Sequence, residues 1–469
     1  MSGFTADIQL VYVLAAGLFV VGLHLMNSPA TARRGNQVAL AGMVVAIVLT
    51  LILMAHDGTV TAAGWAVLVC GALVGAGFGL YAAQTVRMTA MPQLVSMFNA
   101  VGGGAAALVA VHDYINAESA GAALGTTTVF TLLDVLIGSV TFSGSIVAAG
   151  KLQGLIPGQP IMLRGGRVIN TALAVVAIGT AAFLLGTASL PGLLVVVLGA
   201  LAFGVMMVLP IGGADMPVVI SLLNACTGTA VAMAGFVIGN WALIVAGALV
   251  GASGGILTKL MADAMNRSLG NIIVGGFGTG DSTAALAVAG DAQIRSIAAD
   301  DAAIQLAYAA KVIIVPGYGL AAAQAQHGVA ELASVLEDHG VEVSYAIHPV
   351  AGRMPGHMNV LLAEANVPYP QLKEMDEVNP EFARTDVALV IGANDVTNPA
   401  ARRPGTPLSG MPILDVDQAK SIIVIKRSMG HGYAGIDNEL YANPKTSMYF
   451  ADAKKAAADL TAAVKTLVG

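Results

Sequence analysis

The chain has 469 residues, of which 56% are hydrophobic and 11% are charged, and its mean hydropathy is +0.78. A soluble globular protein carries about 25% charged residues, so the composition excludes that class for the chain as a whole. The formal net charge of −6 arises from Asp291 onward, where 20 acidic and 14 basic residues compare with eight of each sign before it. The sequence therefore predicts a charge-poor membrane domain followed by a charged soluble domain.

Residues 1–262 are predicted to form the transmembrane domain, because they contain nine apolar segments that can each cross about 30 Å of hydrocarbon. These segments are Phe4–Met26, Val38–Ala55, Val60–Tyr81, Met91–Val111, Ala122–Ala149, Val168–Gly186, Pro191–Leu209, Pro217–Ile238 and Trp241–Met261. The first basic residue is Arg33, so the N-terminal segment lacks the charged start of a secretory signal and is expected to be retained. Cys70 and Cys226 both fall inside apolar segments, so neither a disulfide framework nor a metal site is predicted.

The connections between the segments alternate in charge. One set holds all eight basic residues that precede Asp291: Arg33, Arg34, Arg87, Lys151, Arg164, Arg167, Lys259 and Arg267. The opposite set holds no lysine or arginine. The positive-inside rule makes the basic side cytoplasmic. With nine spans, the N-terminus is expected outside and the soluble domain in the cytoplasm, with the chain in a bacterial inner membrane.

Polar side chains within apolar segments are costly to bury and are therefore candidates for function. Asn99, Asp134 and Asn224 lie in three different segments, and Asp134 is the carboxylate predicted deepest in a span. Asp215 stands at a cytoplasmic span end. These groups could supply a proton path, or the two asparagines could simply bond neighbouring helices, and the sequence leaves both interpretations open. His24, near the cytoplasmic end of the first span, fits a packed or interfacial residue better than a proton carrier.

Two segments carry glycines at every fourth position: Gly71, Gly75 and Gly79 in one, Gly247, Gly251 and Gly255 in the other. This spacing lets helix backbones approach closely. Tight helix packing is expected there, rather than a direct role in transport.

The soluble domain is predicted at residues 295–469, after a linker at 263–294 that contains the glycine-rich stretch Gly275–Gly280. Its strand-like runs are Val312–Val315, Val341–Ile347, Val387–Ile391, Ser421–Ile425 and Met448–Phe450, and its helical stretches include Leu320–Asp338 and Asp452–Leu467. Alternating strands and helices are typical of a parallel sheet covered on both faces. The predicted fold class is a polytopic α-helical membrane bundle of about nine spans followed by an α/β, Rossmann-like doubly wound domain.

The first strand-like run leads into Gly317-Tyr318-Gly319-Leu320-Ala321-Ala322, which matches the Gly-x-Gly-x-x-Ala fingerprint of a dinucleotide pyrophosphate site. Two glycines permit a sharp turn and a close approach of the backbone to phosphate. A helix that follows directs its positive N-terminus at that phosphate. The alternative is that the glycines only pack a strand–turn–helix connection.

Ligands of doubly wound sheets bind at the carboxyl ends of the strands. The loop after the second run, His348–His357, has no acid for a ribose 2′-hydroxyl and instead contains Arg353, a candidate phosphate clamp. Lys426-Arg427, at the end of the fourth run, suit a 2′-phosphate, although such a pair can also be a solvated loop feature. These features favour NADP(H) over NAD(H).

Two further loop residues have open roles. Asp395, in the loop Gly392–Pro399, stands where it could touch the nicotinamide ribose and report its ionisation to the membrane, or it could form a plain Asx turn. Tyr433, flanked by Gly432 and Gly435, could cover the nucleotide as a lid or be an ordinary turn residue.

The sequence has no HExxH or P-loop motif and no paired acid and base beside a substrate pocket. A domain that binds NADP(H) without an organic substrate site needs a redox partner from elsewhere. One rival interpretation is a channel or transporter whose dinucleotide domain is only a sensor. A membrane-anchored dehydrogenase is disfavoured, because nine spans exceed what an anchor needs.

The chain resembles the beta subunit of proton-translocating NAD(P) transhydrogenase over nearly its whole length. The segments that carry the resemblance are MPQLV at Met91–Val95, VTFSGS at Val140–Ser145, Ile211–Ala225, AMNRS at Ala264–Ser268, VPGYGLAAAQAQ from Val315, Ile347–Tyr369, EMDE at Glu374–Glu377, VIGANDVTNPA from Val390, Gly410–Val416 and KRSMGHGYAG at Lys426–Gly435.

The resemblance implies an oxidoreductase of the Re/Si-specific, proton-translocating type. It implies that the membrane domain conducts protons, that the C-terminal domain binds NADP(H), and that a separate alpha subunit brings NAD(H), in a dimer of alpha–beta units in the bilayer without nucleic acid. Hydride would pass between the two nicotinamides. The residues that this resemblance implicates in NADP(H) contact are Gly317, Tyr318 and Gly319 in the first turn, Val350, Ala351, Gly352, Arg353, Met354 and Pro355 in the second loop, Gly392, Ala393, Asn394 and Asp395 in the third, Lys426 and Arg427 at the 2′-phosphate, and Gly432, Tyr433 and Ala434 in the covering loop.

The resemblance also assigns coupling roles. It makes Asp395 a candidate for a protonation-sensitive gate, places Asp215 and Arg267 between the membrane and nucleotide domains, and makes Asn224 a functional polar residue. Some bacterial relatives carry a histidine, proposed as the proton carrier, in the span where this chain has Asn99. The resemblance therefore leaves the identity of the proton carrier open.

Overall fold

The computed structural model describes the chain except for residues 1–2, 27, 59, 88–89, 120–124, 158–160, 162, 164, 213–215, 265–293, 353–355, 407, 431, 433 and 469. The chain divides into two compact units. The membrane unit comprises Met1–Pro210 and Val219–Thr258, and the sheet unit comprises Ile211–Val218 and Lys259–Gly469. Most of the linker predicted at 263–294 lies outside the described residues.

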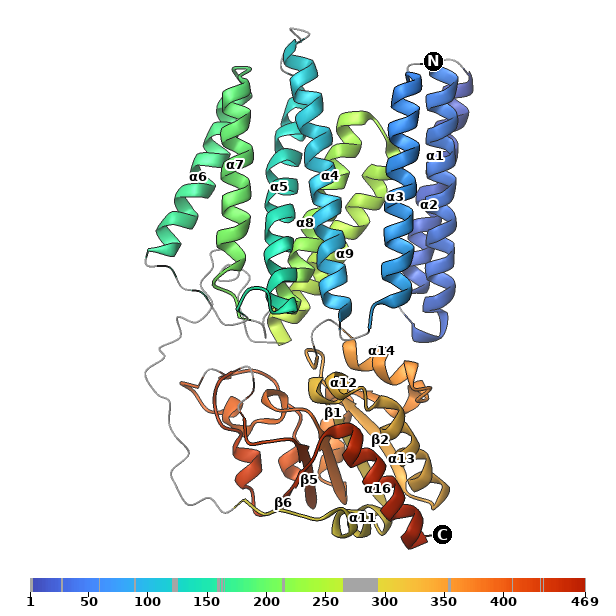
Figure 1. The fold of residues 1–469 in the computed structure, drawn as a ribbon, viewed down its shortest axis with the longest axis vertical. Coiled ribbons are helices and arrows are strands. Elements are labelled where there is room, and N and C mark those ends of the chain that lie inside the picture. Colours follow the sequence, from blue (N-terminus) through green and yellow to red (C-terminus); the bar gives the residue numbers. More distant parts are fainter. Residues whose placement is uncertain are drawn as a thin grey trace. The chain divides into compact units, whose positions relative to one another are not determined.

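The first part of the chain is a series of long helices (Figure 1). They are α1 (Gly3–Leu25), α2 (Pro29–Asp57), α3 (Ala62–Thr85), α4 (Met91–Ser119), α5 (Thr126–Gln153), α6 (Gly166–Leu184), α7 (Leu190–Val208), α8 (Met216–Ile238) and α9 (Trp241–Ala264). Among the described residues, eight of these helices are long and apolar enough to cross a membrane, and α1 holds a shorter apolar stretch, Leu10–Leu25. Each helix overlaps one predicted apolar segment, so this part of the predicted fold is confirmed.

Glycines bring the helices of the membrane unit into backbone contact. A Cβ added to Gly138 of α5 would lie 2.6 Å from the carbonyl oxygen of Gly103 in α4. A Cβ on Gly204 of α7 would lie 2.4 Å from the carbonyl oxygen of Val140 in α5. Any larger residue at these positions would force the helices apart, as expected for small-residue packing in membranes.

The two predicted glycine patterns behave differently. Gly247 is packed against α8, because a Cβ there would lie 2.4 Å from the amide nitrogen of Ala232. The glycines of α3, Gly71, Gly75 and Gly79, meet nothing within 4 Å, and α3 has no buried residue among those described. Close packing is therefore confirmed for Gly247 and Gly251 of α9, but within the described chain it is absent at Gly255 and at the three glycines of α3.

The sheet unit contains a six-stranded sheet of order β3-β2-β1-β4-β5-β6, in which all neighbouring strands are parallel. The strands are β1 (Lys311–Pro316), β2 (Glu342–Ile347), β3 (Leu372–Glu374), β4 (Val387–Ile391), β5 (Ser421–Lys426) and β6 (Thr446–Phe450). Buried runs of valine and isoleucine explain why these residues form strands that are covered on both faces. This strand order is that of a dinucleotide-binding doubly wound fold, with its switch point between β1 and β4.

Helices cover both faces of the sheet. On one side α11 (Ala299–Ala307), α13 (Gln326–Asp338) and α16 (Ala453–Val468) pack together (Figure 1). On the other, Phe382 of α15 (Met375–Phe382) joins the core formed by alternate strand residues. The remaining elements are α12 (Tyr318–Ala323), α14 (His357–Glu364) and 3₁₀ turns at Tyr369–Gln371, Asp395–Thr397, Pro399–Arg402, Val416–Gln418 and Glu439–Ala442.

The predicted single helix Leu320–Asp338 is wrong, because the structure interrupts it after Ala323. The chain forms the six-residue α12, leaves the helical path at Gln324 with φ of +52°, and begins α13 at Gln326. Gln324 is not a glycine and nothing in its sequence context signals the left-handed conformation, which few non-glycine residues adopt.

Asp386 ties together the starts of β1, β4 and β5. Its Oδ2 accepts hydrogen bonds from the amides of Ala310 and Lys311 at 2.9 and 3.0 Å, and Lys420 donates to its Oδ1 at 2.8 Å. The Lys420 contact is the largest of several effects that together hold the pKa of this carboxyl below its usual value.

Asp386→Asn is therefore expected to destabilise the sheet unit by about 1–2 kcal/mol at neutral pH, because the amide cannot accept the same set of hydrogen bonds. A carboxyl whose pKa is depressed by folding stabilises above its unfolded pKa, and the difference should shrink as pH falls through the folded pKa. Denaturant titrations at several pH values measure this. Exposed Glu364 supplies the control Glu364→Gln, and equal stability of both variants would contradict the role given to Asp386.

Candidate functional site

Two glycine loops interlock at the switch point of the sheet. The amide of Gly317 donates to Ile391 O at 2.9 Å, and the amide of Gly319 donates to Gly392 O at 3.0 Å. A Cβ on Gly317 would lie 2.4 Å from the Cα of Ala393, and a Cβ on Gly319 would lie 2.6 Å from the Cα of Gly392. The fingerprint glycines thus bring the loop after β1 against the loop after β4. Since α12 spans only six residues, the long helix expected behind the turn is absent.

The loop after β2 is fixed by a buried histidine. His348 is 1% exposed, its Nε2 lies 2.8 Å from Pro412 O, and its Nδ1 accepts from the amide of Val350 at 3.2 Å. This arrangement requires the neutral ring with the proton on Nε2. Burial lowers the pKa of His348 to about 4. The first residue after β2 is thus a buried, neutral histidine and not an acid.

The rest of that loop packs on the start of α14. Ala351 is buried, and a Cβ on Gly352, whose φ is +103°, would lie 2.5 Å from the Nδ1 of His357. The ring of His357 lies 6.3 Å from the ring of Tyr318, centroid to centroid, so this loop also reaches the turn after β1. Residues 353–355, predicted as part of the site, lie outside the described residues.

Asp395 holds the loop that follows β5. Its Oδ2 accepts a hydrogen bond from the amide of Ala434 at 3.0 Å. A Cβ on Gly432 would lie 2.2 Å from Oδ1 of the same carboxylate, so a larger residue there would displace this side chain. Tyr433 lies outside the described residues. The structure therefore connects the predicted gate residue directly to the predicted covering loop, 39 residues away in sequence.

Lys426 is half-buried at the carboxyl end of β5, whereas Arg427 is exposed. The ammonium of Lys426 donates to Gly430 O and lies 4.7 Å from the centroid of the Tyr441 ring. Burial lowers the pKa of this ammonium, and the carboxylates of Asp395 and Asp437 act in the opposite direction.

Three residues of this site were not predicted from the sequence. The hydroxyl of Tyr441 donates to Oδ1 of Asn394 at 3.0 Å, and the side-chain amide of Asn438 donates to Asn394 O at 2.9 Å. Asn398, fully buried, donates to Asp437 O at 3.0 Å. These contacts join the loop after β4 to the segment 437–441. The NDVTNP motif is the one sequence signal that could have drawn attention to Asn398.

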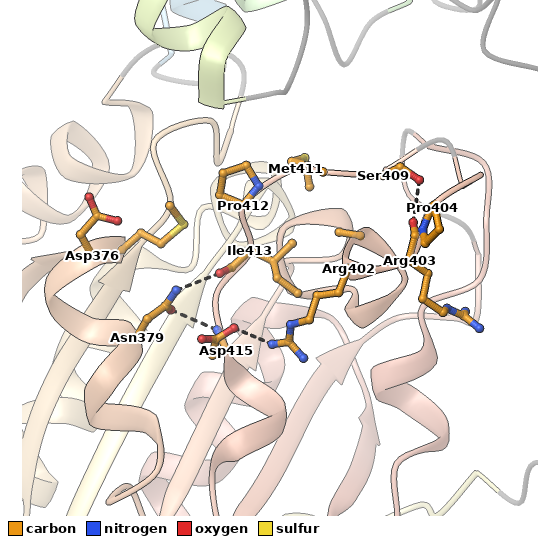
Figure 2. Close-up of a pocket in the computed structure, with 13 residues that line it drawn as sticks. Asp376, Asn379, Arg402, Arg403, Pro404, Ser409, Met411, Pro412, Ile413 and Asp415 are labelled. Atoms are coloured by element: carbon orange, nitrogen blue, oxygen red, sulfur yellow. Dashed lines mark hydrogen bonds and ion pairs between the residues drawn. The ribbon is translucent and has the colours of Figure 1, made fainter.

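A pocket of about 690 Å³ lies elsewhere in the sheet unit, between α15 and residues 401–415 (Figure 2). The two arginines that line it take part in ion pairs. Arg402 donates to Asp415 and Asp417, and Arg403 pairs with Glu439. Asn379 spans the wall of the pocket, donating to Ile413 O at 3.0 Å. None of the residues predicted to bind nucleotide lines this pocket, so it is a separate feature.

Polar residues of the membrane unit also come together. Asn224 of α8 donates to the Oδ1 of Asn99 in α4 at 3.0 Å, and Thr227 donates to Asn99 O at 3.3 Å. Asn99 donates in turn to Ile220 O at 3.4 Å. The buried Asn99 and the partly buried Asn224, 125 residues apart in sequence, thus form one cluster between two helices.

Comparison with known proteins decides the family. A sequence model of the NAD(P) transhydrogenase beta subunit matches residues 8–463. Two curated proteins from Rhodospirillum rubrum, one from a designated strain and both named NAD(P) transhydrogenase subunit beta, are each 49% identical to the chain over 451 residues. These matches cover 95% of the chain and 96% of each relative.

The chain belongs to the NAD(P) transhydrogenase beta subunit family. Membership of this family implies a multi-pass membrane protein whose enzyme binds nicotinamide nucleotides. The name beta subunit implies an alpha subunit as its partner.

Within this transhydrogenase fold, the predicted residues fall into three groups. The loops after β1 and β4 meet, Asp395 meets the covering loop, and Asn99 meets Asn224. Asp134, 0% exposed in α5, does not contact that asparagine pair through any recorded hydrogen bond. Asp215 and Arg267 lie outside the described residues, so their predicted place between the two domains stays a prediction.

Proposed function

We propose that this chain is the NADP(H)-binding and proton-conducting subunit of a transhydrogenase, and that hydride passes between NADP(H) held here and NAD(H) held by the alpha subunit. The observation that carries the proposal is the family match over residues 8–463, together with a doubly wound sheet whose switch-point loops hold the predicted residues. The proposed division is a proton-conducting domain at 1–262, a linker at 263–294 and the nucleotide domain at 295–469.

The residues at the switch point suit a 2′-phosphorylated dinucleotide. Lys426 provides a half-buried ammonium and Arg427 an exposed guanidinium at the end of β5, and the neutral His348 replaces the acid that would favour NAD(H). Cationic side chains of these two kinds complement a phosphate by charge and by planar hydrogen bonding. The loops at 317–322, 350–355, 392–395 and 432–434 would surround the nucleotide, whose nicotinamide supplies the hydride chemistry when bound.

Asp395 is proposed as the group that links proton movement to the nucleotide. Its carboxylate accepts from the amide of Ala434, so the charge on this group bears directly on how the covering loop is held. Hydrogen bonds to a charged acceptor are stronger than those to a neutral one. Loss of that charge would loosen the loop, which supports a gate that responds to protonation. Asp215 and Arg267 are proposed to carry the coupling between the domains.

The proposed assembly is a dimer of alpha–beta units in the bacterial inner membrane. The proposed orientation, with the N-terminus outside and the nucleotide domain in the cytoplasm, rests on the one-sided placement of the basic residues. Reaction of a single introduced cysteine with an impermeant thiol reagent, in variants lacking Cys70 and Cys226, would test this orientation.

The function is tested in vesicles that contain the chain with its alpha partner. Imposing a proton gradient, acidic on the side of the N-terminus, is expected to accelerate reduction of NADP⁺ by NADH and to be accompanied by proton entry. An uncoupler that dissipates the gradient is the control. Catalysis that is indifferent to the gradient would contradict the coupling, and absence of any hydride exchange with the alpha subunit present would contradict the transhydrogenase assignment and favour the sensor interpretation.

A further inference from the structure

Asp134 is a buried carboxyl group that the nucleotide chemistry does not use. Its side chain is 0% exposed, and neither carboxyl oxygen has a hydrogen-bond partner among the described residues. It lies eight residues into α5, which is about 12 Å along the helix axis from the helix start. At that depth an ionised, unpartnered carboxylate is far more costly than the neutral acid, so the position is suited to a group that holds a proton.

The helix face that carries Asp134 is directed at the junction of α4, α5 and α8. Phe130, one turn before it, stacks on Phe236 of α8 with a centroid separation of 4.6 Å. Ile137, three residues after it, packs against Ala106 of α4 and against Ala230 and Ala234 of α8. Residues three and four apart share one helix face. Asp134 therefore lies on the same face, between these two contacts. The line along which α4, α5 and α8 meet is called the seam below.

Toward the end of α5 that the charge pattern predicts to be outside, a second carboxylate lies close to this face. Thr131, one turn before Asp134, donates to Oδ2 of Asp113 in α4 at 3.1 Å. Thr131 is 1% exposed, whereas Asp113 is only partly buried. Asp113 and Thr131 thus connect the outer end of the seam with the level of Asp134.

Toward the other end, the same seam leads to the asparagine cluster. Thr141 of α5 and Thr227 of α8 contact successive glycines of α4, since Cβ atoms on Gly103 and Gly102 would each lie 2.9 Å from them. Thr227 donates to Asn99 O at 3.3 Å. Thr141 is seven residues from Asp134, about 10 Å along α5. The hydroxyl of Thr141 donates to Ile137 O within α5 at 2.7 Å, and that of Thr227 donates across to α4, so polar side chains are present on the inner part of this helix junction.

The ionisable groups on the helices around this seam leave Asp134 without a close counter-ion. They are His112, Asp113, Tyr114 and Glu118 of α4, Lys151 of α5, Arg167 of α6 and Cys226 of α8, while α7 has none. Lys151 is 17 residues along α5 from Asp134, about 25 Å. Lys151 and Arg167 stand near the ends of their helices, and His112 directly precedes Asp113, whose Oδ2 accepts a hydrogen bond from Thr131.

From this geometry we propose that Asp134 is the proton-binding residue of the outer half of the membrane unit. It takes a proton from the outer aqueous phase by way of Asp113, holds it as a neutral acid, and releases it inward to the seam that contains Thr141, Thr227 and the Asn99–Asn224 pair. One proton enters and one leaves, so no other reactant is needed. This inference rests on the proposed proton-translocating function and names a titratable residue for it, since Asn99 and Asn224 cannot titrate.

The test uses the complete alpha–beta complex in vesicles. In Asp134→Asn, which keeps the shape and removes the titration, the gradient-driven rate of NADP⁺ reduction and the accompanying proton entry are expected to fall by about 100-fold, the size of a lost proton-transfer group. NADPH affinity should stay at the wild-type value, and Asp134→Glu should restore a large part of the rate. Ser139→Ala, a buried polar change on the same helix, is the matched control and should behave as wild type.

A spectroscopic readout keeps the proposal testable if Asp134→Asn does not assemble. Wild-type complex should show an infrared carbonyl band of a protonated carboxylic acid that shifts in D₂O, and Asp134→Glu should move that band. A band that is unmoved in Asp134→Glu, or a wild-type gradient response in Asp134→Asn, overturns the proposal. If the wild-type complex itself shows no gradient response, the proposed function has failed instead, and the two failures are thereby distinguished.

Discussion

Lys426→Ala combined with Arg427→Ala is expected to weaken NADPH binding by about 2–5 kcal/mol, the cost of losing charge-assisted contacts to a phosphate. NADH lacks the 2′-phosphate, so its weak binding should hardly change. The two single variants should differ. Lys426 is half-buried and also contacts Gly430 and Tyr441, so its loss should disturb the covering loop as well, whereas Arg427 is exposed. Titration of the full chain with NADPH and with NADH measures both affinities.

The control for this pair is Lys454→Ala with Lys455→Ala, which removes two exposed cations from α16 of the same unit. It corrects for the change in net charge, which acts at long range and is screened by salt. If the α16 variant weakens NADPH as much as the β5 variant, the Lys426-Arg427 pair acts only through the general field of the protein. If neither variant weakens NADPH, the pair is a surface feature and the phosphate is held elsewhere.

Acidification from pH 7 to pH 4 is expected to remove about 3 kcal/mol of folding free energy from the sheet unit through His348, because one pKa unit corresponds to about 1.4 kcal/mol. The folded pKa of His348 is lowered from 6.5 to about 4. Below pH 6.5 the unfolded chain therefore binds a proton on this ring, whereas the folded chain does not. The folding free energy present above pH 6.5 is lost progressively down to pH 4. The protonated ring could no longer accept from the amide of Val350.

Hydrogen exchange in the full chain can follow this loss, read on peptides that cover residues 342–352 and 408–416 and corrected for the intrinsic pH dependence of exchange. His348→Gln should flatten the pH dependence, since glutamine does not titrate in this range. His327→Gln, an exposed histidine on α13, is the matched control and should keep the wild-type slope. A slope that survives in His348→Gln would assign the acid sensitivity to the carboxylates of the unit.

The strands of the sheet unit follow directly from local sequence. Val387–Ile391 is a run of buried residues that the structure reproduces as β4 without a shift, and the runs at β1, β2, β5 and β6 are displaced by two residues at most. β3 was missed because Leu372–Glu374 is three residues long and only partly buried. Such a short edge strand forms because it pairs with β2, and pairing with a neighbouring strand cannot be read from the three residues themselves.

The site depended more on tertiary contact. The glycine fingerprint was found from sequence, but its packing against Gly392 and Ala393 joins positions more than 70 residues apart and has no local signal. Tyr441 was missed for the same reason, since its hydroxyl meets Asn394 across 47 residues. In the membrane unit, hydropathy located the helices and the polar residues, but the absence of a partner for Asp134 among the described residues is visible only when the neighbouring helices are in place.

The interlocked loops at Gly317, Gly319 and Gly392 have a consequence for how fast a nucleotide can leave. The main-chain hydrogen bonds and close backbone contacts prevent the loop after β1 from shifting relative to the loop after β4. The two loops are therefore expected to move as one rigid body. The segment that can move is then the loop from Lys426 to Gly435, which the carboxylate of Asp395 connects to the loop after β4. Exchange of the nucleotide proposed to bind here should therefore depend on breaking the charge-assisted contact between Asp395 and Ala434, and the loops at Gly317, Gly319 and Gly392 should keep the same conformation whether the site is open or closed.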